Sequence, residues 1–252
     1  MTSILDHQAI SGKYLLPQDR KLRRPLWISV NDVKLACYRK MIDPSAFTLI
    51  HFHGNGEAVA DYVPFMTDVF EEMDVNQLFI EYRDYGGSSG QAELVAMLDD
   101  GEAVMQAVGI APESAIVFGR SIGSLYAIEL AYRQPSIAGL IIESGIADPS
   151  ERFLTYADLE FSGISESDVR AEVAKYFDHQ LKLSSYTNPL LIMHTENDGL
   201  IDISHAERNF EWAGSKQKSL VRFPKGNHNS IFPSNKKHYI AAVTEFIDEL
   251  RD

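Results

Sequence analysis

The sequence predicts an α/β protein with a mostly parallel central sheet and helices on both of its faces. Short apolar runs of strand length alternate along the chain with segments in which apolar residues recur every three or four positions, the pattern of βαβ units. The length of 252 residues, with 45% hydrophobic and 23% charged residues, is typical of one large globular domain. We therefore expect residues 1–252 to form a single domain around one sheet.

The chain is expected to begin with an arm and a hairpin. Residues 1–25 have weak periodicity, so they are predicted to lie as an arm over the body of the protein. Segments 26–30 and 34–41 flank the turn-like pair Asn31 and Asp32, which indicates an antiparallel hairpin. This hairpin is expected to form an antiparallel edge of the sheet.

The alternation of strands and helices starts after this hairpin. Residues 47–52 are a short apolar strand, and the next segment has seven apolar residues at helical spacing: Val59, Tyr62, Val63, Met66, Val69, Phe70 and Met73. A strand at 77–82 and a glycine-rich loop follow. A helix is then predicted over 92–108, with an inward face formed by Leu94, Val95, Leu98, Met105 and Val108.

The second half of the chain repeats this pattern with one interruption. Helices are predicted over 122–133 and near the C-terminus, and strands at 115–118, 140–143, 190–194 and 220–223. Residues 146–188 are too long for a simple crossover connection, so we predict a lid or cap insertion there. The alternative is a helical excursion that only covers the edge of the sheet.

Charge and cysteine content exclude several classes of protein. The 23 lysines and arginines against 36 aspartates and glutamates give 23 − 36 = −13, a net charge that repels nucleic acid and anionic lipid surfaces. No apolar stretch approaches the length of a membrane span, so no integral membrane segment is expected. Cys37 is the only cysteine, which favours a cytoplasmic location. Nothing in the sequence indicates an oligomeric state.

A candidate nucleophile follows the predicted strand 115–118. Ser121 is the centre of Gly119-Arg120-Ser121-Ile122-Gly123, which matches Gly-x-Ser-x-Gly, and a predicted helix begins directly after it. A sharp strand-to-helix turn would strain the backbone at Ser121 and hold its hydroxyl above the sheet, while the flanking glycines allow close packing. The backbone amide of Ile122, at the positive end of the helix, is a candidate oxyanion donor.

The chain also contains a candidate base and a candidate carboxylate for this serine. His228 lies in a loop after the strand at 220–223, and Asp198 follows the strand at 190–194. The order Ser121, Asp198, His228 is the one expected for a nucleophile, an orienting acid and a base on such a sheet. Asp202 is an alternative for the acid, and Asp198 is favoured because it directly follows its strand.

A second oxyanion donor is predicted where the strand at 47–52 ends. There His51-Phe52-His53-Gly54-Asn55-Gly56 forms a glycine-containing turn, and the backbone amide of Asn55 is our candidate. His51 and His53 have the two-residue spacing seen in some binuclear zinc hydrolases, but no further ligands follow at the expected positions. We therefore expect no metal and no cofactor. No residue is singled out for substrate binding.

Together these motifs resemble the α/β-hydrolase superfamily, in particular the serine hydrolases with His-Gly-Asn, Tyr-Arg-x-Tyr-Gly-x-Ser-x-Gly and Gly-Arg-Ser-Ile-Gly motifs. The second motif appears here as Tyr82-Arg83-Asp84-Tyr85-Gly86-Gly87-Ser88-Ser89-Gly90. The resemblance runs from about residue 26 to the C-terminus, although Asp202 stands where members often have proline. It implies an α/β-hydrolase fold and an acyl-enzyme mechanism with a Ser121–Asp198–His228 triad.

The predicted function is hydrolysis of a carboxylic ester or thioester bond in a small or acyl-chain substrate. Aromatic residues between 146 and 188 would suit an acyl group: Phe153, Tyr156, Phe161, Tyr176 and Phe177. Residues 146–172 contain seven acidic residues and two arginines, which disfavours strongly anionic leaving groups. An aminopeptidase that receives a cationic N-terminus in an acidic lid, and a non-enzymatic binding scaffold, are the alternatives.

Overall fold

A mixed sheet runs through the centre of the molecule, in a computed structural model that describes residues 2–63, 65–160 and 162–251. Among these residues the strand order is β1-β2-β4-β3-β5-β6-β7-β8. The strands are β1 (Leu26–Val30), β2 (Val33–Lys40), β3 (Thr48–Phe52), β4 (Asn76–Ile80), β5 (Ala115–Arg120), β6 (Gly139–Glu143), β7 (Leu190–Thr195) and β8 (Lys218–Phe223). Strands β3 to β8 are parallel, and β1 and β2 pair antiparallel at one edge. The predicted fold class is confirmed.

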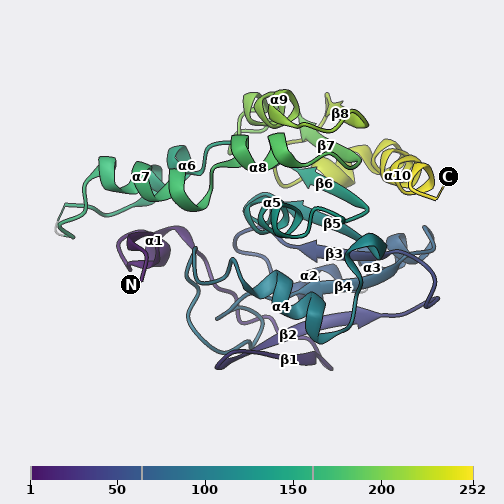
Figure 1. Cartoon of the computed structure of the whole chain (residues 1–252), viewed down its shortest axis with the longest axis horizontal. Helices are drawn as coiled ribbons and strands as arrows, with labels where there is room; N and C mark the ends of the chain where they lie inside the picture. The colour runs from purple at the N-terminus through teal and green to yellow at the C-terminus, as the bar shows by residue number, and fades with distance from the viewer. Residues whose placement is uncertain (1, 64, 161, 252) are drawn as a thin grey trace.

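Helices cover both faces of this sheet (Figure 1). Apolar residues of one face pack with α4 (Asp100–Ala107), α5 (Gly123–Arg133), α8 (His179–Ser185) and α9 (Ile203–Trp212). The other face packs against α2 (Val59–Tyr62), α3 (Phe65–Glu71) and α10 (Ile231–Glu249). None of the helices in the described residues is both long enough and apolar enough to span a membrane.

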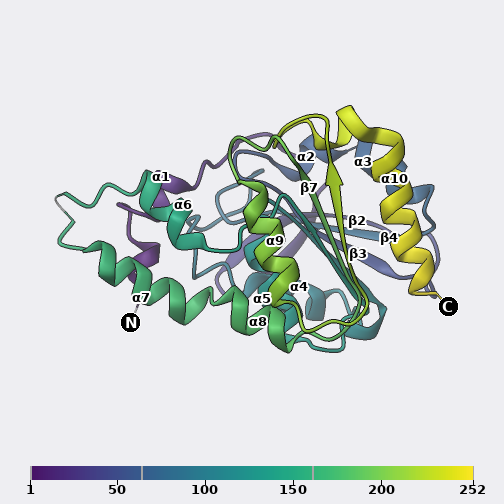
Figure 2. The same cartoon turned by 90° about the horizontal axis from the view of Figure 1, so that it is seen from above.

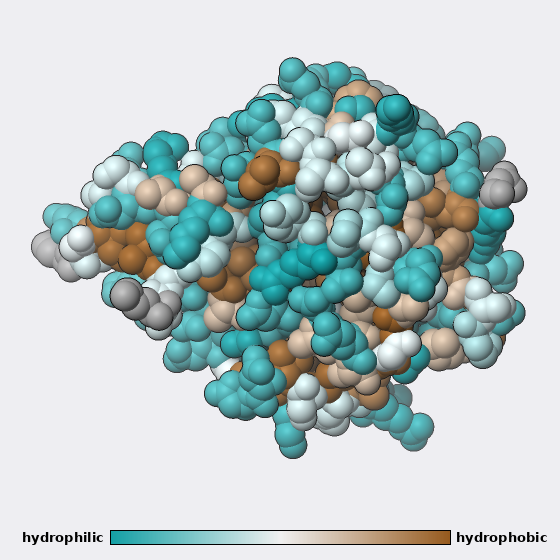
Figure 3. Space-filling model, in the orientation of Figure 1, coloured by the Kyte–Doolittle hydropathy of each residue, from teal (hydrophilic) through white to brown (hydrophobic). Residues whose placement is uncertain are grey.

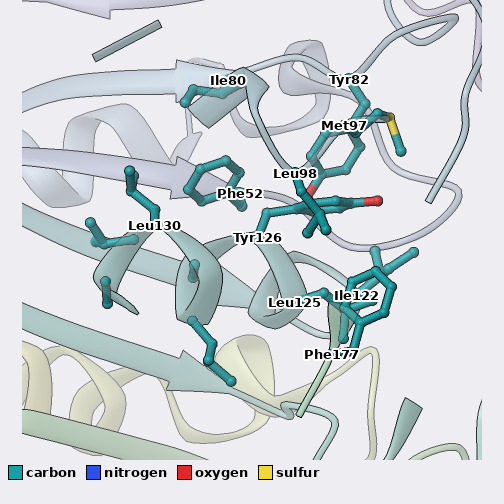
Figure 4. Close-up of a cluster of buried hydrophobic side chains, with 14 of the residues drawn as sticks. Phe52, Ile80, Tyr82, Met97, Leu98, Ile122, Leu125, Tyr126, Leu130 and Phe177 are labelled. Atoms are coloured by element: carbon teal, nitrogen blue, oxygen red, sulfur yellow. The ribbon is translucent and has the colours of Figure 1, made fainter. Parts of the chain in front are cut away.

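The core is divided by the sheet into two apolar clusters. In β5, for example, Ile116 and Phe118 belong to one cluster and Val117 to the other, because successive side chains of a strand point to opposite faces. Figure 4 shows part of the larger cluster, where Phe52 and Leu130 lie between a strand and α5. Because both faces of the sheet are buried, successive residues along its strands are apolar.

Two predicted helices differ from the observed ones. The helix expected over 59–73 is interrupted, because Val63 is extended at φ −100° and ψ 125°. The residue that follows in the sequence is proline, which disfavours the helical conformation of the residue before it. The helix expected over 92–108 begins only at Asp100, and the turns before it lie against the N-terminal arm.

That arm fixes the turns through its side chains. The backbone amide of Leu94 donates to Ser11 Oγ at 3.0 Å, and that of Val95 donates to Asp6 Oδ1 at 2.7 Å. Because these side chains accept hydrogen bonds from backbone amides that a helix would use, no regular helix forms before Asp100. The arm contains the short helices η1 (Ile4–Asp6) and α1 (Ser11–Tyr14).

Residues 146–188, which we call the helical excursion, contain α6 (Pro149–Tyr156), α7 (Glu166–Tyr176) and α8. Figures 1 and 2 show α6 and α7 at one end of the molecule beside α1 of the arm. Tyr14 of the arm packs against Phe153 and Tyr156 of α6 at ring-centroid distances of 5.1 and 5.7 Å. Phe161, which the sequence prediction also placed here, lies outside the described residues.

Hydrophilic residues predominate on the face drawn in Figure 3, and hydrophobic residues form separate groups among them. One of these groups lies at the end of the molecule occupied by α6 and α7. Scattered exposed apolar residues are usual on globular proteins. The grouping at α6 and α7 shows that this end presents apolar side chains to its surroundings.

Candidate active site

The turn between β5 and α5 has the strained backbone that the sequence predicted. Ser121 has φ +52°, in the left-handed region that non-glycine residues rarely adopt. Its backbone amide donates to the carbonyl of Glu143 on β6 at 2.8 Å, which holds the turn at the carboxyl end of the sheet. The Ser121 residue is 8% exposed and lines a cavity of about 180 Å³.

Glycines on both sides of Ser121 allow its turn to pack closely. A Cβ on Gly123 would lie 2.2 Å from the backbone oxygen of Phe52, and a Cβ on Gly119 would lie 2.6 Å from that of Gly123. Both contacts are with backbone atoms, which cannot move aside as a flexible side chain can. A larger residue at Gly123 would therefore separate β3 from α5, and one at Gly119 would separate β5 from α5.

Gly123→Ala is expected to lower stability by about 1–3 kcal/mol, because the added methyl group overpacks the junction of β3 and α5. At about 2–4 °C per kcal/mol for a chain of this size, the melting temperature should fall by several degrees. Differential scanning calorimetry of Gly123→Ala and Gly199→Ala measures this effect. A Cβ on Gly199 would meet no heavy atom within 4 Å beyond its chain neighbours, so this variant should melt like the wild type. Equal melting temperatures for both variants would contradict the packing argument.

Three side chains from different loops lie in hydrogen-bond contact at this turn. His228 Nε2 is 2.9 Å from Ser121 Oγ, and His228 Nδ1 is 2.7 Å from Asp198 Oδ2. Asp198 follows β7, and His228 lies between β8 and α10. The fold therefore brings together three residues that are 77 and 30 positions apart in the sequence (198 − 121 and 228 − 198).

Asp198 is held as a carboxylate. Burial acts to raise its pKa, but hydrogen bonds from His194 and His228 and from the Ile201 amide outweigh burial and lower the pKa well below its usual value. The carboxyl is therefore ionised at neutral pH. Asp202, the alternative considered from the sequence, instead caps α9 by accepting from the Ser204 amide at 3.0 Å.

His51, in β3, and His53, in the turn that follows it, have separate structural surroundings. His53 Nε2 is 2.8 Å from Glu81 Oε1, in a pair that is almost fully buried. Burial acts to lower the pKa of His53, but the Glu81 carboxylate outweighs burial and raises it. His51 packs against the rings of Tyr62 and Phe118, and burial lowers its pKa. The two rings thus support the backbone where β3 ends. Among the described residues, no three or more histidine, cysteine, aspartate or glutamate side chains lie together in a way that could hold a metal ion.

Asn55 joins this turn to the N-terminal arm. Its Oδ1 accepts hydrogen bonds at 2.9 Å from the Leu16 amide and from the Tyr85 hydroxyl, and its Nδ2 donates to the Tyr14 carbonyl at 2.6 Å. From the sequence, only the backbone amide of Asn55 is predicted to belong to the site. The hydrogen bonds of the Asn55 side chain fix the path of the arm beside Ser121.

Arg120 connects the site to the interior of the protein. Its guanidinium forms ion pairs with Glu57 and Glu143, and its Nη2 donates to the backbone carbonyl of His228 at 2.9 Å. The Tyr239 hydroxyl donates to Glu143. Burial raises the pKa of Glu143, while the charge of Arg120 acts to lower it. Arg120 therefore holds the loop of His228 in place and keeps two carboxylates partnered.

Residues from six parts of the chain line the cavity beside Ser121. They are Lys13, Tyr14, Leu16, Asn55, Arg120, Ser121, Arg152, Tyr156, Leu200, Ile201, His228 and Asn229. Tyr156 of α6, one of the aromatic residues that the sequence suggests for an acyl group, lines the cavity, and so does the arm, for which the sequence predicts no role in the site. Among the described residues no aspartate or glutamate lines this cavity. This lining depends on contacts between segments that are distant in the sequence, so local sequence patterns do not predict it.

The β5–Ser121–α5 turn on a mostly parallel sheet, with a histidine and an aspartate from later loops against the serine, defines an α/β hydrolase. The sequence profile of the prolyl oligopeptidase family matches residues 82–252. The chain belongs to this family.

Curated relatives are similar over most of this chain. Human alpha/beta hydrolase domain-containing protein 17B is 30% identical over 188 residues, which are 71% of this chain and 59% of the relative. Mouse alpha/beta hydrolase domain-containing protein 17C is 28% identical over 193 residues, 73% of this chain and 55% of the relative. The chain therefore spans less than two thirds of the length of these relatives.

Solved structures share the fold at lower identity. An esterase of Pyrococcus furiosus superposes with a TM-score of 0.72 at 18% identity, over 93% of this chain and 99% of that one. Mouse alpha/beta hydrolase domain-containing protein 10 superposes with a TM-score of 0.67 at 14% identity, over 90% of this chain and 99% of that one. These similarities establish the α/β-hydrolase fold for this chain.

Proposed function

We propose that this protein is a serine hydrolase that cleaves carboxylic ester or thioester bonds through an acyl-enzyme. The observation that supports it most is the chain of contacts from Ser121 Oγ through His228 to Asp198 beside a cavity. His228 Nε2 takes the serine proton while Oγ attacks the substrate carbonyl carbon. The ionised Asp198 stabilises the imidazolium that forms.

The later steps use the same groups. The backbone amides of Ile122, at the start of α5, and Asn55, on the cavity wall, are the proposed donors to the oxyanion. Collapse of the tetrahedral intermediate breaks the bond to the leaving alcohol or thiol, which receives its proton from His228. Water activated by His228 then hydrolyses the acyl-enzyme and releases a carboxylic acid. No metal or cofactor takes part in this scheme.

Labelling by a fluorophosphonate, mapped by mass spectrometry, tests this proposal. The wild type should be labelled at Ser121, and Asp198→Asn should slow labelling by about 10²–10⁴-fold, because the histidine loses its carboxylate partner. Asp202→Asn should be labelled at the wild-type rate, since Asp202 caps α9. A larger loss for Asp202→Asn than for Asp198→Asn would contradict the assignment. Absence of labelling in a folded wild type would favour the binding scaffold.

The cavity supports a small or short acyl group. Its volume of about 180 Å³ is below the ~300–1,000 Å³ of pockets that enclose drug-sized ligands. In a series of 4-nitrophenyl esters from acetate to palmitate, kcat/KM should peak at a short chain and fall by about tenfold or more at the longest. Constant kcat/KM across the series would contradict an acyl pocket of this size.

A peptidase of the same fold is the second candidate, because the matching family is described as that of prolyl oligopeptidase. A peptidyl amide and the matched ester, assayed in parallel, separate the two activities. The proposed location is the cytoplasm, on the argument that the only cysteine, Cys37, is a buried free thiol.

A further inference from the structure

The cavity beside Ser121 has a charge of opposite sign to that of the whole chain. The protein has a net charge of −13, yet Lys13 from the arm, Arg120 from β5 and Arg152 from α6 all line this cavity. Within the described residues its lining contains no aspartate or glutamate. A lining with these charges favours a ligand that carries a negative charge.

The three cations differ in how far other groups neutralise them. Arg120 is paired with Glu57 and Glu143. Lys13 Nζ is 3.5 Å from Asp158 Oδ2, but these side chains are 53% and 57% exposed, so the pair is weak. Arg152 forms no ion pair with a carboxylate in the part of the chain that the structure describes. Arg152 is therefore the cation that is left for a ligand.

Aromatic residues hold Arg152 in position without neutralising it. Arg152 Nη2 donates to the Tyr156 hydroxyl at 3.1 Å, and its guanidinium carbon lies 5.3 Å from the centre of that ring. Burial raises the pKa of the neighbouring Tyr14 to about 12, so this phenol is uncharged at neutral pH. The buried Nε of Arg152 has no hydrogen-bond partner among the described residues. A guanidinium with free donors matches the planar oxygens of a carboxylate or phosphate.

We propose that Arg152, assisted by Lys13, binds an anionic group of the substrate, a carboxylate or a phosphate, beside the bond that Ser121 attacks. This inference rests on the proposed hydrolase function and adds the class of substrate. Three exposed apolar residues line the same cavity: Leu16, Tyr156 and Leu200. The substrate is therefore an ester or thioester that combines a short apolar part with a negative charge.

Two matched pairs of esters test the charge and locate it in the substrate. The first pair, 4-nitrophenyl hydrogen adipate and methyl 4-nitrophenyl adipate, has the anion or its neutral ester in the acyl part. The second pair, butyrylglycerol phosphate and monobutyrin, has the phosphate or a hydroxyl in the leaving part. In at least one pair kcat/KM should be about tenfold or more higher for the anion, the effect of a hydrogen-bonded charge. Ser121→Ala protein serves as the blank for spontaneous hydrolysis.

Variants of the two arginines in the excursion link this preference to Arg152. In Arg152→Gln the ratio of anionic to neutral kcat/KM should fall towards one, and Arg152→Lys should retain part of it. Arg170→Gln should keep the wild-type ratio, because Arg170 contacts Ser150 and does not line the cavity. Ratios near one for both pairs in the wild type would overturn the inference while leaving hydrolysis intact. An unchanged ratio in Arg152→Gln would overturn the role of Arg152.

Binding without turnover separates this inference from the proposed function. Calorimetry on Ser121→Ala should show tighter binding of monomethyl adipate than of dimethyl adipate, with the difference lost when Arg152→Gln is added. If no ester is hydrolysed but this difference appears, the hydrolase proposal fails and the anion site stands. If monomethyl adipate binds no tighter than dimethyl adipate, and butyrylglycerol phosphate binds no tighter than monobutyrin, the anion site is wrong whatever the enzyme hydrolyses.

Discussion

Ser121→Ala is expected to reduce ester hydrolysis by about 10⁴–10⁶-fold, because the bond that forms in the first step loses its nucleophile. Fluorophosphonate labelling should disappear with it. His228→Ala should cost about as much, and the double variant should cost little more than either, because residues that act as a unit have non-additive effects. Steady-state kinetics with a neutral 4-nitrophenyl ester measure all three.

The matched control for this serine is one strand away. Ser144 follows β6 as Ser121 follows β5, has φ +48°, and is fully buried. It does not line the cavity of Ser121. Ser144→Ala should therefore keep turnover and labelling near wild-type values. Turnover that survives in Ser121→Ala, or is lost only in Ser144→Ala, would show that Ser121 is not the nucleophile.

Arg120→Met is expected to lower the free energy of unfolding by about 3–5 kcal/mol, because it leaves buried Glu143 without its cationic partner. Burial already raises the pKa of Glu143, and removal of Arg120 raises it further. A raised native pKa means that the carboxyl binds a proton more readily when folded, so stability falls as the pH rises through that pKa. The loss should therefore be larger at pH 8 than at pH 5, as urea unfolding at both values will show.

Two further variants separate charge from packing at this position. Adding Glu143→Gln to Arg120→Met should restore part of the stability and remove much of the pH dependence, because the buried carboxyl that lost its partner is then an uncharged amide. Arg170→Met, at an exposed arginine, should change stability by less than about 0.5 kcal/mol. A pH-independent loss in Arg120→Met would mean that packing, and not the buried charge, dominates.

Much of the fold could be predicted from the sequence because its signals are local. The apolar run before Ser121 and the periodic residues after it predict a strand and a helix, and the structure has β5 and α5 there. Likewise, Asn31 and Asp32 predict the turn between β1 and β2, where Asn31 has φ +52°. Each of these features depends on residues that are near in sequence.

Features that depend on distant segments could not be predicted in this way. The helix expected over 92–108 is shortened where Asp6 and Ser11 bind the backbone, contacts that span more than 80 residues. Similarly, the acidity of residues 146–172 does not indicate which side chains face the cavity. Arg152 faces it, whereas the acidic residues of this segment do not line it.

The link between Asn55 and the arm has a consequence for how substrate range could diversify. One wall of the cavity comes from Lys13, Tyr14 and Leu16, and hydrogen bonds join this segment to the side chains of Asn55 and Tyr85. The groups proposed for bond cleavage lie on loops of the sheet, and the groups proposed for recognition lie on the arm and α6. Exchange of the arm sequence is therefore expected to alter selectivity, but only an arm that preserves the contacts with Asn55 would leave this proposed oxyanion donor in place.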